Sequence, residues 1–216
     1  MRMAGRLRLG LYVITIADAG RGRGHVDVAR AALAGGADAL QLRDKELEGG
    51  ALYRLALEVR GAVEESGADC LFLVNDRVDV AVAAGADGVH LGQEDLPAPA
   101  ARALLGEGRI LGISAGTVAE AVRAEREGAD YLGVGPVFPT PSKDDAGEPI
   151  GLEGLRRIRN AVALPLVAIG GIDEEKLEAV FAAGADGVAV ISAVTSAADM
   201  EAAVRRLRRA VDSCRT

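Results

Sequence analysis

Charged and polar side chains recur directly after short apolar runs in this sequence. Asp76 follows the apolar residues 71–74, and Asp95 closes the cluster that comes after residues 88–91. If both runs are neighbouring parallel strands, their carboxyl ends lie together and the two carboxylates converge. Mg²⁺ prefers oxygen ligands and is commonly held by one or two carboxylates together with substrate phosphates. The pair therefore predicts a magnesium site, although either Asp alone would more often cap the following helix.

Three cations stand in the same kind of position. Arg43 and Lys45 follow another apolar run, and Lys143 lies in a long segment after a later run. Taken alone, each of them would more often be a solvated surface charge. Opposite two metal-binding carboxylates they suit a polyphosphate, whose charge is neutralised by a metal and by basic side chains together. The alternative for Arg43 is an ion pair with Asp44 or Glu46 in a structural network.

A second group of residues suits a phosphate without a metal. Gly170 and Gly171 follow one apolar run, and Ile191 and Ser192 follow the last one. In α/β barrels the loops after strands seven and eight commonly bind phosphate through backbone N–H groups. Glycine lets the backbone approach the anion closely, although a Gly-Gly pair can also be a tight turn. The sequence thus predicts two anion sites on one face.

The composition is that of a globular chain with an aliphatic core. Half of its 216 residues are apolar, yet only 3% are aromatic and there is no Trp. A chain of this length is long enough to bury a sizeable core. The net charge of −7 argues against a general nucleic-acid binder. A local cationic pocket for an anionic substrate remains compatible with this charge.

The N-terminal segment and the cysteines bear on the cellular compartment. Arg2, Arg6 and Arg8 precede the apolar residues 9–17, which loosely imitates a secretory signal. That stretch is short and rich in β-branched residues, so a first strand explains it better. No apolar run approaches the length of a membrane-spanning helix. With only Cys70 and Cys214, a disulfide framework is not expected, and we predict a cytoplasmic location.

The triplet Gly-Ala-Asp divides the chain into repeating units. Each copy follows an Ala-rich amphipathic segment and precedes a run rich in Val, Ile and Leu. The Gly suits a left-handed helix end, and the Asp suits the turn into a strand. The five copies begin at Gly36, Gly67, Gly85, Gly128 and Gly184. A repeated helix–turn–strand unit predicts parallel strands, and their near-continuous apolar character predicts a sheet covered on both faces.

Counting these units gives an eightfold arrangement of strands and helices. The predicted strands lie near 11–16, 38–43, 70–75, 88–92, 109–114, 131–135, 165–169 and 187–191. The predicted helices lie near 25–35, 50–66, 77–84, 97–105, 117–127, 152–161, 174–183 and 197–212. Two long loops, 17–24 and 136–151, follow strands, where loops of that length are commonly functional. We expect a single-domain (β/α)8 TIM barrel of the α/β class over residues 1–216, with a doubly wound open sheet as the alternative.

These segments together resemble the thiamine-phosphate synthase (thiamine-phosphate pyrophosphorylase) family. The matching segments are 41–45 (QLRDK), 74–76 (VND), 90–95 (HLGQED), 112–114 (GIS), 135–143 (GPVFPTPSK), 169–172 (IGGI) and 191–192 (IS). Each segment is weak evidence alone, whereas all of them in the family's order, each at a predicted strand end, are specific. The resemblance extends from Leu11 to about Val204.

The resemblance implies a magnesium-dependent transferase of thiamine biosynthesis on a (β/α)8 barrel. Its substrates would be 4-amino-2-methyl-5-(diphosphooxymethyl)pyrimidine and a thiazole phosphate, with or without an extra carboxylate. Its products would be thiamine phosphate and pyrophosphate, with CO₂ from the carboxylated thiazole. A dissociative displacement without a covalent protein intermediate would link them. The partners would be these small molecules, with no nucleic acid and no membrane, and the sequence leaves an oligomer open.

The resemblance also implies roles for individual residues. The pyrimidine diphosphate would be held by Gln41, Arg43, Lys45, Asn75, Ser114 and Lys143. The thiazole phosphate would be held by Thr140, Ser142, Gly171, Ile191 and Ser192. The metal ligands would be Asp76 and Asp95. The catalytic groups would be Arg43, Lys45, Ser114 and Lys143. The three cations among them would stabilise the charge of the leaving pyrophosphate.

The chain departs from the usual family pattern in small ways. Asp44 stands where Glu is more usual, and Ser142 stands where Thr is common, which keeps the hydroxyl. The loop 17–24 carries additional arginines, and its role is the least defined. His90 lies inside a predicted strand and is interpreted as a structural histidine. None of these differences removes a ligand group.

Three other functions stay open at this point. A thiazole tautomerase of the same fold would need only a proton-transfer group, so retention of Asp76, Asp95 and Lys143 favours the synthase. An isomerase of sugar phosphates would explain the second anion site but not the carboxylate pair. A non-catalytic barrel that only binds thiazole phosphate is the third. Release of pyrophosphate from the pyrimidine substrate, with and without Mg²⁺, separates all of them.

Overall fold

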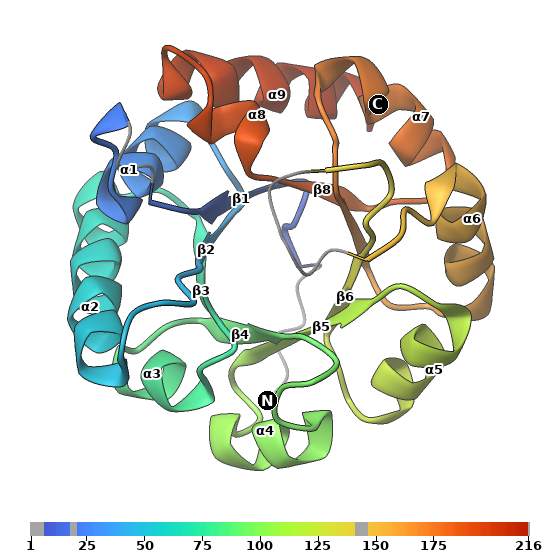
Figure 1. Cartoon of the computed structure of the whole chain (residues 1–216), viewed down its shortest axis with the longest axis horizontal. Helices are drawn as coiled ribbons and strands as arrows, with labels where there is room; N and C mark the ends of the chain where they lie inside the picture. Colours follow the sequence, from blue (N-terminus) through green and yellow to red (C-terminus); the bar gives the residue numbers. More distant parts are fainter. Residues whose placement is uncertain (1–6, 18–20, 141–146, 216) are drawn as a thin grey trace.

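Eight parallel strands close into a barrel in the computed structural model, which describes residues 7–17, 21–140 and 147–215 (Figure 1). The strands follow one another around the barrel in chain order, and β1 pairs with β8 to close it. They are β1 (Leu11–Thr15), β2 (Ala39–Leu42), β3 (Leu71–Asn75), β4 (Gly88–Leu91), β5 (Ile110–Ala115), β6 (Tyr131–Val134), β7 (Leu166–Ile169) and β8 (Gly187–Val190). The predicted TIM barrel is confirmed, and the open-sheet alternative is wrong. The domain boundary of 1–216 stays a prediction.

The strands are apolar on both sides because both sides are buried. Along β1, Tyr12 and Ile14 belong to the cluster inside the barrel, whereas Leu11 and Val13 belong to the cluster between sheet and helices. This period of two is the usual alternation of a strand. Residues of the inner cluster fill the barrel, so its interior is a packed core rather than a pore.

Helices cover the outside of the barrel in a ring (Figure 1). They are α1 (His25–Gly35), α2 (Gly49–Ser66), α3 (Val78–Ala83), α4 (Ala98–Leu105), α5 (Val118–Arg126), α6 (Gly151–Ala161), α7 (Leu177–Ala182), α8 (Ser192–Thr195) and α9 (Met200–Cys214). Two predictions are wrong in detail. The predicted helix 174–183 divides into a 3₁₀ turn, η2 (Glu174–Lys176), and α7, and the short helix α8 precedes α9.

The Gly-Ala-Asp triplets do more than end helices. The Gly of each copy has a positive φ, as predicted for a left-handed helix end. In four copies the Asp also accepts the backbone N–H of the first or second residue of the preceding strand. These bonds run from Leu11 to Asp38, from Phe72 to Asp87, from Leu111 to Asp130 and from Leu166 to Asp186. Each of these carboxylates therefore links two neighbouring strands at the amino-terminal end of the barrel.

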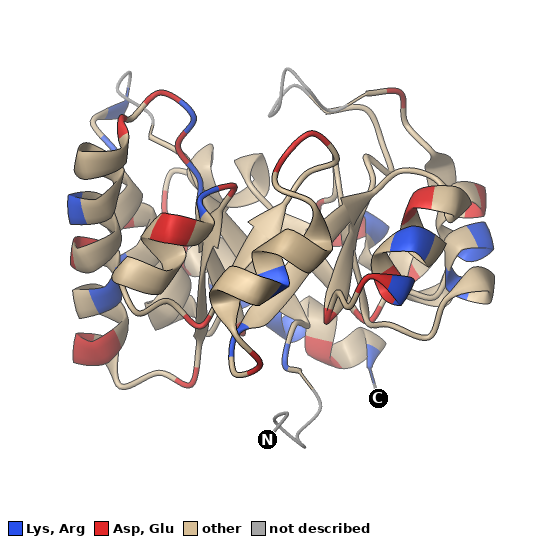
Figure 2. Ribbon diagram, turned by 90° about the horizontal axis from the view of Figure 1, so that it is seen from below, with Lys and Arg blue, Asp and Glu red and all other residues tan. Residues whose placement is uncertain are grey.

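Charge is mixed over the outside of the molecule. Seen from the side, acidic and basic positions of the described chain are interspersed over helices and loops (Figure 2). None of the helices in the described ranges combines the length and the apolar character that crossing a membrane requires.

Candidate active site

A cavity of about 660 Å³ opens at the carboxyl end of the barrel, a volume typical of small-molecule sites. Its walls come from the segments after β2, β4, β5, β6, β7 and β8. Of the predicted site residues, those that line it are Lys45, Asp95, Ser114, Thr140, Gly171, Ile191 and Ser192. These seven are a third of the 21 residues that line the cavity, so the site residues predicted at strand ends account for part of its wall.

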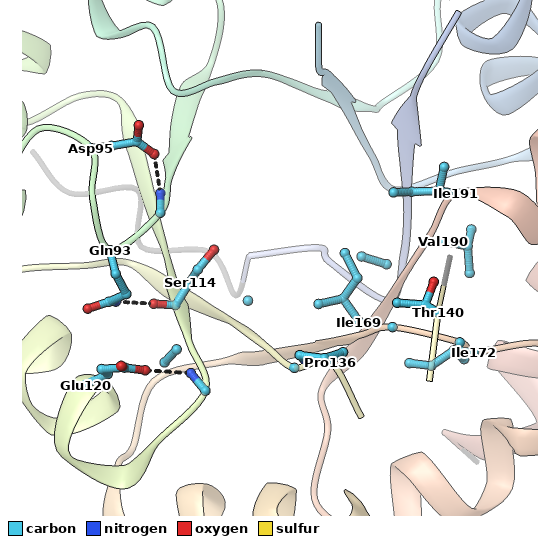
Figure 3. A pocket seen from close by; sticks show the side chains of 18 of the residues that line it. Gln93, Asp95, Ser114, Glu120, Pro136, Thr140, Ile169, Ile172, Val190 and Ile191 are labelled. Atoms are coloured by element: carbon cyan, nitrogen blue, oxygen red, sulfur yellow. Dashed lines mark hydrogen bonds between the residues drawn. The ribbon is translucent and has the colours of Figure 1, made fainter. Parts of the chain in front are cut away.

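The two sides of this cavity differ in character (Figure 3). Asp95, Gln93, Ser114 and Glu120 form a polar side. The opposite side is mostly apolar, with its side chains from Pro136, Ile169, Ile172, Val190 and Ile191. A ligand with a charged end and an apolar ring would match this arrangement.

Asp76 and Asp95 lie next to each other, as predicted from the sequence. Asp76 has a φ of 61°, and its N–H donates to the carbonyl of His90 at 2.9 Å. Burial raises the pKa of Asp76 to about 6, helped by the hydrogen bond and the charge of Asp95 and opposed by Lys45 and Arg43. Asp95 accepts the N–H of Gly92 at 2.6 Å. Two carboxylates held together against their repulsion favour a bound cation between them.

Neither carboxylate has the role of a helix cap. Helix α3 has Arg77 at its N-cap position and α4 has Pro97, and neither helix begins with a side-chain cap. The helix-cap alternative is therefore wrong for both residues. Within the described residues, Asp76 and Asp95 are not joined by a third His, Cys, Asp or Glu in a ready-made metal cluster. Such a pair would need substrate oxygens to complete the coordination of Mg²⁺, which is how this ion is usually bound.

The loop that carries Arg43 and Lys45 is anchored through Asp44 to the buried His25. Lys45 Nζ lies 3.7 Å from Asp76 Oδ2. Asp44 accepts the N–H groups of the two residues after Lys45, and its Oδ2 lies 3.0 Å from Nε2 of His25. Burial lowers the pKa of His25, against the effect of Asp44, so the imidazole is neutral at pH 7. Asp44 thus anchors the loop to α1, a contact that sequence reasoning missed.

The other ring nitrogen of His25 is also used. Thr15 Oγ1 lies 2.7 Å from His25 Nδ1, which completes a hydroxyl–imidazole–carboxylate series with Asp44. Thr15 is fully buried, so its hydroxyl cannot reach a substrate as a nucleophile. The series is structural, and it fixes the ends of β1 and β2 relative to α1.

Gln41 lies deeper than the sequence suggested. It lines a small chamber of about 20 Å³ inside the barrel, below the main cavity, together with Tyr12, Tyr131, His90 and Ser114 among others. Its Nε2 donates to the hydroxyl of Tyr12 at 2.7 Å, while its buried Oε1 has no hydrogen-bond partner among the described residues. Asn75 is also buried, at the end of β3 beside Asp76. Ser142 and Lys143 lie outside the described residues, so their roles stay predictions.

The Gly170–Gly171 turn is shaped by its neighbours. Gly171 has a φ of 62°, and a Cβ there would lie 2.4 Å from the carbonyl oxygen of Pro139 and 2.9 Å from Cβ of Phe138. Gly170 meets Pro136 in the same way, at 2.6 Å from its Cα. These glycines therefore let β7 pack against the segment after β6, a reason independent of any phosphate. A valine at Gly171 would disturb this packing whether or not a phosphate binds there.

Arg23 connects the first loop to the segment after β8. Its Nη1 donates to the carbonyls of Thr195 at 2.7 Å and Ala197 at 2.6 Å, and its Nη2 donates to that of Ala198 at 3.0 Å. These carbonyls belong to the end of α8 and the turn that follows it, and α8 begins at the cavity-lining Ser192. The part of loop 17–24 that the structure describes thus has a positioning role.

Comparisons with known proteins point to one family. The family model described as thiamine monophosphate synthase matches residues 11–194. A thiamine-phosphate synthase of Moorella thermoacetica is 58% identical over 95% of this chain and 97% of its own length. The corresponding protein of Methanoculleus marisnigri is also 58% identical, over 92% and 93% of the two chains.

A solved structure gives the same result in three dimensions. The thiamine phosphate pyrophosphorylase from Pyrococcus furiosus superposes with a TM-score of 0.86 at 46% identity. The superposition covers 95% of this chain and 96% of that chain. The resemblance of the sequence motifs is confirmed, and this chain belongs to the thiamine monophosphate synthase family.

Proposed function

We propose that this chain is a thiamine-phosphate synthase that joins a pyrimidine diphosphate to a thiazole phosphate and releases pyrophosphate. The observation that carries the proposal is the Asp76–Asp95 pair, with Lys45 Nζ 3.7 Å from Asp76 Oδ2. Both Asp95 and Lys45 line the cavity. A diphosphate with its metal needs both acidic and basic groups, and a tautomerase would need neither the pair nor the cations. The high identity to synthases over nearly the whole chain supports the same choice.

The proposed site divides between the two substrates. The diphosphate lies at the polar side, near Arg43, Lys45 and Asp95, with Ser114 facing the pyrimidine. The thiazole phosphate lies at the apolar side, near Thr140, Gly171, Ile191 and Ser192, all of which line the cavity. When bound at Asp76 and Asp95, Mg²⁺ would neutralise part of the diphosphate charge. Lys143, in the loop before α6, would add a further positive charge.

The chemistry then asks for charge stabilisation and positioning. The carbon–oxygen bond to the diphosphate breaks first, and the amino group of the pyrimidine donates electrons to the cationic methylene. Arg43 and Lys45 stabilise the charge that develops on the leaving group. The thiazole nitrogen then attacks the methylene carbon, since both rings are held in one cavity. No protein nucleophile takes part in this sequence.

Release of pyrophosphate tests the proposal directly. The purified chain, given the pyrimidine diphosphate and thiazole phosphate, should form thiamine phosphate and pyrophosphate in equal amounts. A chelator should abolish the reaction and added Mg²⁺ should restore it. Formation of neither product from this pair of substrates would contradict the proposal. Both cysteines are free, which supports the proposed cytoplasmic location.

A further inference from the structure

A series of buried hydrogen bonds crosses the barrel interior and ends at the cavity. Gln41 Nε2 lies 2.7 Å from the hydroxyl of Tyr12, and this hydroxyl lies 3.0 Å from that of Tyr131. The Tyr131 hydroxyl lies 2.9 Å from His90 Nδ1, and His90 Nε2 lies 3.0 Å from Ser114 Oγ. The series links β2, β1, β6, β4 and β5 in that order. Only its last member lines the main cavity.

Two glycines make room for the rings of this series. A Cβ at Gly112 would lie 2.2 Å from Cζ of Tyr131, and a Cβ at Gly133 would lie 2.8 Å from Cε1 of His90. Both distances are far shorter than a carbon–carbon contact. The motif residue Gly112 therefore serves the Tyr131 ring. The two rings also lie close, with centroids 5.5 Å apart.

The hydrogen atoms of the series run in one direction. An amide nitrogen only donates, so the Tyr12 oxygen accepts from Gln41. Because Tyr12 is buried, its own hydrogen needs an acceptor, and the Tyr131 oxygen 3.0 Å away takes that role. Burial raises the pKa of both tyrosines well above the usual value, so both phenols keep their hydrogens. Tyr131 then donates to His90 Nδ1, which must be the bare nitrogen of a neutral imidazole. His90 carries its hydrogen on Nε2 and donates it to Ser114 Oγ.

We propose that Tyr131 is a positioning residue that holds His90 in the Nε2–H tautomer, so that the Ser114 hydroxyl points its own hydrogen into the cavity. Ser114 is then a donor to an acceptor atom of the ligand. If Tyr131 could not donate, the imidazole hydrogen would be free to move to Nδ1, and Ser114 would have to donate to Nε2 instead. The consequence for substrate binding rests on the proposed function, in which Ser114 contacts the pyrimidine.

Nitrogen NMR of the ligand-free protein tests the tautomer without any assay of activity. The chain has only two histidines, so ¹⁵N-histidine labelling gives few signals, and His90→Asn assigns them. We expect the Nε2–H form for His90 in the parent and a shift towards Nδ1–H in Tyr131→Phe. Tyr53→Phe is the matched control, because it also removes one phenol hydroxyl but lies at an exposed position on α2, outside the series. An Nδ1–H form in the parent protein would overturn the proposal, even if Tyr131→Phe fails to fold.

A kinetic cycle tests whether Tyr131 acts through Ser114. Tyr131→Phe should raise the KM for the pyrimidine diphosphate by about tenfold, the effect of one hydrogen bond, and leave the KM for the thiazole phosphate within twofold. In a Ser114→Ala background the same change should have no further effect. An equal loss in both backgrounds would show that Tyr131 does not act through Ser114. Absence of thiamine phosphate formation by the parent would refute the proposed function, and the NMR result would then decide the role of Tyr131 alone.

Discussion

At the scale of single residues, the cavity end of the barrel holds Asp76 in an unfavourable backbone conformation and an unfavourable electrostatic environment. Asp76 combines a left-handed backbone with a buried carboxylate beside Asp95. A non-glycine residue with positive φ costs stability and persists where the surrounding structure over-determines it. Asp and Asn tolerate this region better than other side chains. The sequence position after a strand predicted the role of Asp76, whereas its strain is visible only in the fold.

Replacing one carboxylate should separate activity from stability. In Asp76→Asn or Asp95→Asn the side chain keeps its shape, but the repulsion between two carboxylates is gone. We expect turnover to fall by at least about 100-fold, while the free energy of unfolding stays the same or rises by up to about 1 kcal/mol. Steady-state pyrophosphate release and urea denaturation measure the two effects.

The matched control is Asp79→Asn on the neighbouring helix α3. Asp79 pairs with Arg77 at the surface and does not line the cavity. This variant should keep the turnover of the parent within twofold. A loss of stability in Asp76→Asn as large as its loss of activity would argue that Asp76 is a structural residue.

The residues that position the cavity-lining groups, but do not line the cavity themselves, were not predicted from the sequence. His25, Tyr131 and Arg23 each bind a partner far away in the sequence, Arg23 being 172 residues before Thr195. A motif shows which residue types follow a strand, but not which side chains turn towards each other inside the barrel. Lys176 is another case, since it donates to the carbonyl of Gly171 at 2.7 Å and lies over the ring of Phe138.

At the scale of elements, the sequence predicts most of the helix and strand boundaries. The Gly-Ala-Asp triplets mark the joints between helix and strand, and the predicted strands lie within about two residues of the observed ones. Helix α8 was missed because four residues are too few to show a helical period. The 3₁₀ turn before α7 was merged with it for the same reason.

The Asp of the first triplet gives a stability prediction with a defined pH dependence. Burial raises the pKa of Asp38, but the N–H of Leu11 and the charges of Arg208 and Arg8 outweigh it and lower the pKa. A lowered carboxyl pKa contributes stability above the unfolded value of about 4 and loses it as the pH falls through the folded value. Asp38→Asn should therefore lower the free energy of unfolding by about 2–3 kcal/mol at pH 7, and by much less near pH 3.

Asp69, the Asp of the second Gly-Ala-Asp triplet, provides the control. Its side chain is 88% exposed, against 5% for Asp38, and within the described residues its ion pair is with the exposed Arg8. Asp69→Asn should change the free energy of unfolding by less than about 0.5 kcal/mol. Urea denaturation at pH 7 and pH 3 compares the two variants. Equal losses at both positions would show that the strand-linking bond of Asp38 contributes little.

The contact between Arg23 and the end of α8 predicts an effect on one substrate. Arg23→Ala removes three hydrogen bonds that hold the segment behind Ser192, and a cation near helical carbonyls is lost as well. We expect the KM for the thiazole phosphate to rise by about tenfold, with a smaller change for the pyrimidine diphosphate. Arg30→Ala, at an exposed position on α1, serves as the control. Equal changes in both KM values would contradict a local role for Arg23.

At the scale of the whole molecule, the pairing that closes the barrel could not be derived from the repeated sequence units. The repeated units predict parallel strands, but pairing of β1 with β8 joins residues such as Leu11 and Val188. Only this non-local pair distinguishes a barrel from an open sheet. Closure also brings the segments after β2, β3 and β4 to the same face as those after β7 and β8. Residues predicted for the two anion sites thereby line one cavity.

Metal and anion should stabilise this closed molecule together rather than singly. Within the described residues no third His, Cys, Asp or Glu joins Asp76 and Asp95, so a bound Mg²⁺ would take its remaining ligands from the oxygens of a diphosphate. A ligand at about 100 times its Kd adds about 2.7 kcal/mol to folding, which for a chain of this size raises Tm by about 5–10 °C. We expect that rise with Mg²⁺ and pyrophosphate together, and less than about a third of it with either alone. Asp95→Asn should abolish the joint effect, measured by calorimetry at fixed pH. A full rise with Mg²⁺ alone would mean that the protein holds the metal without the anion, contrary to the coordination inferred from the pair.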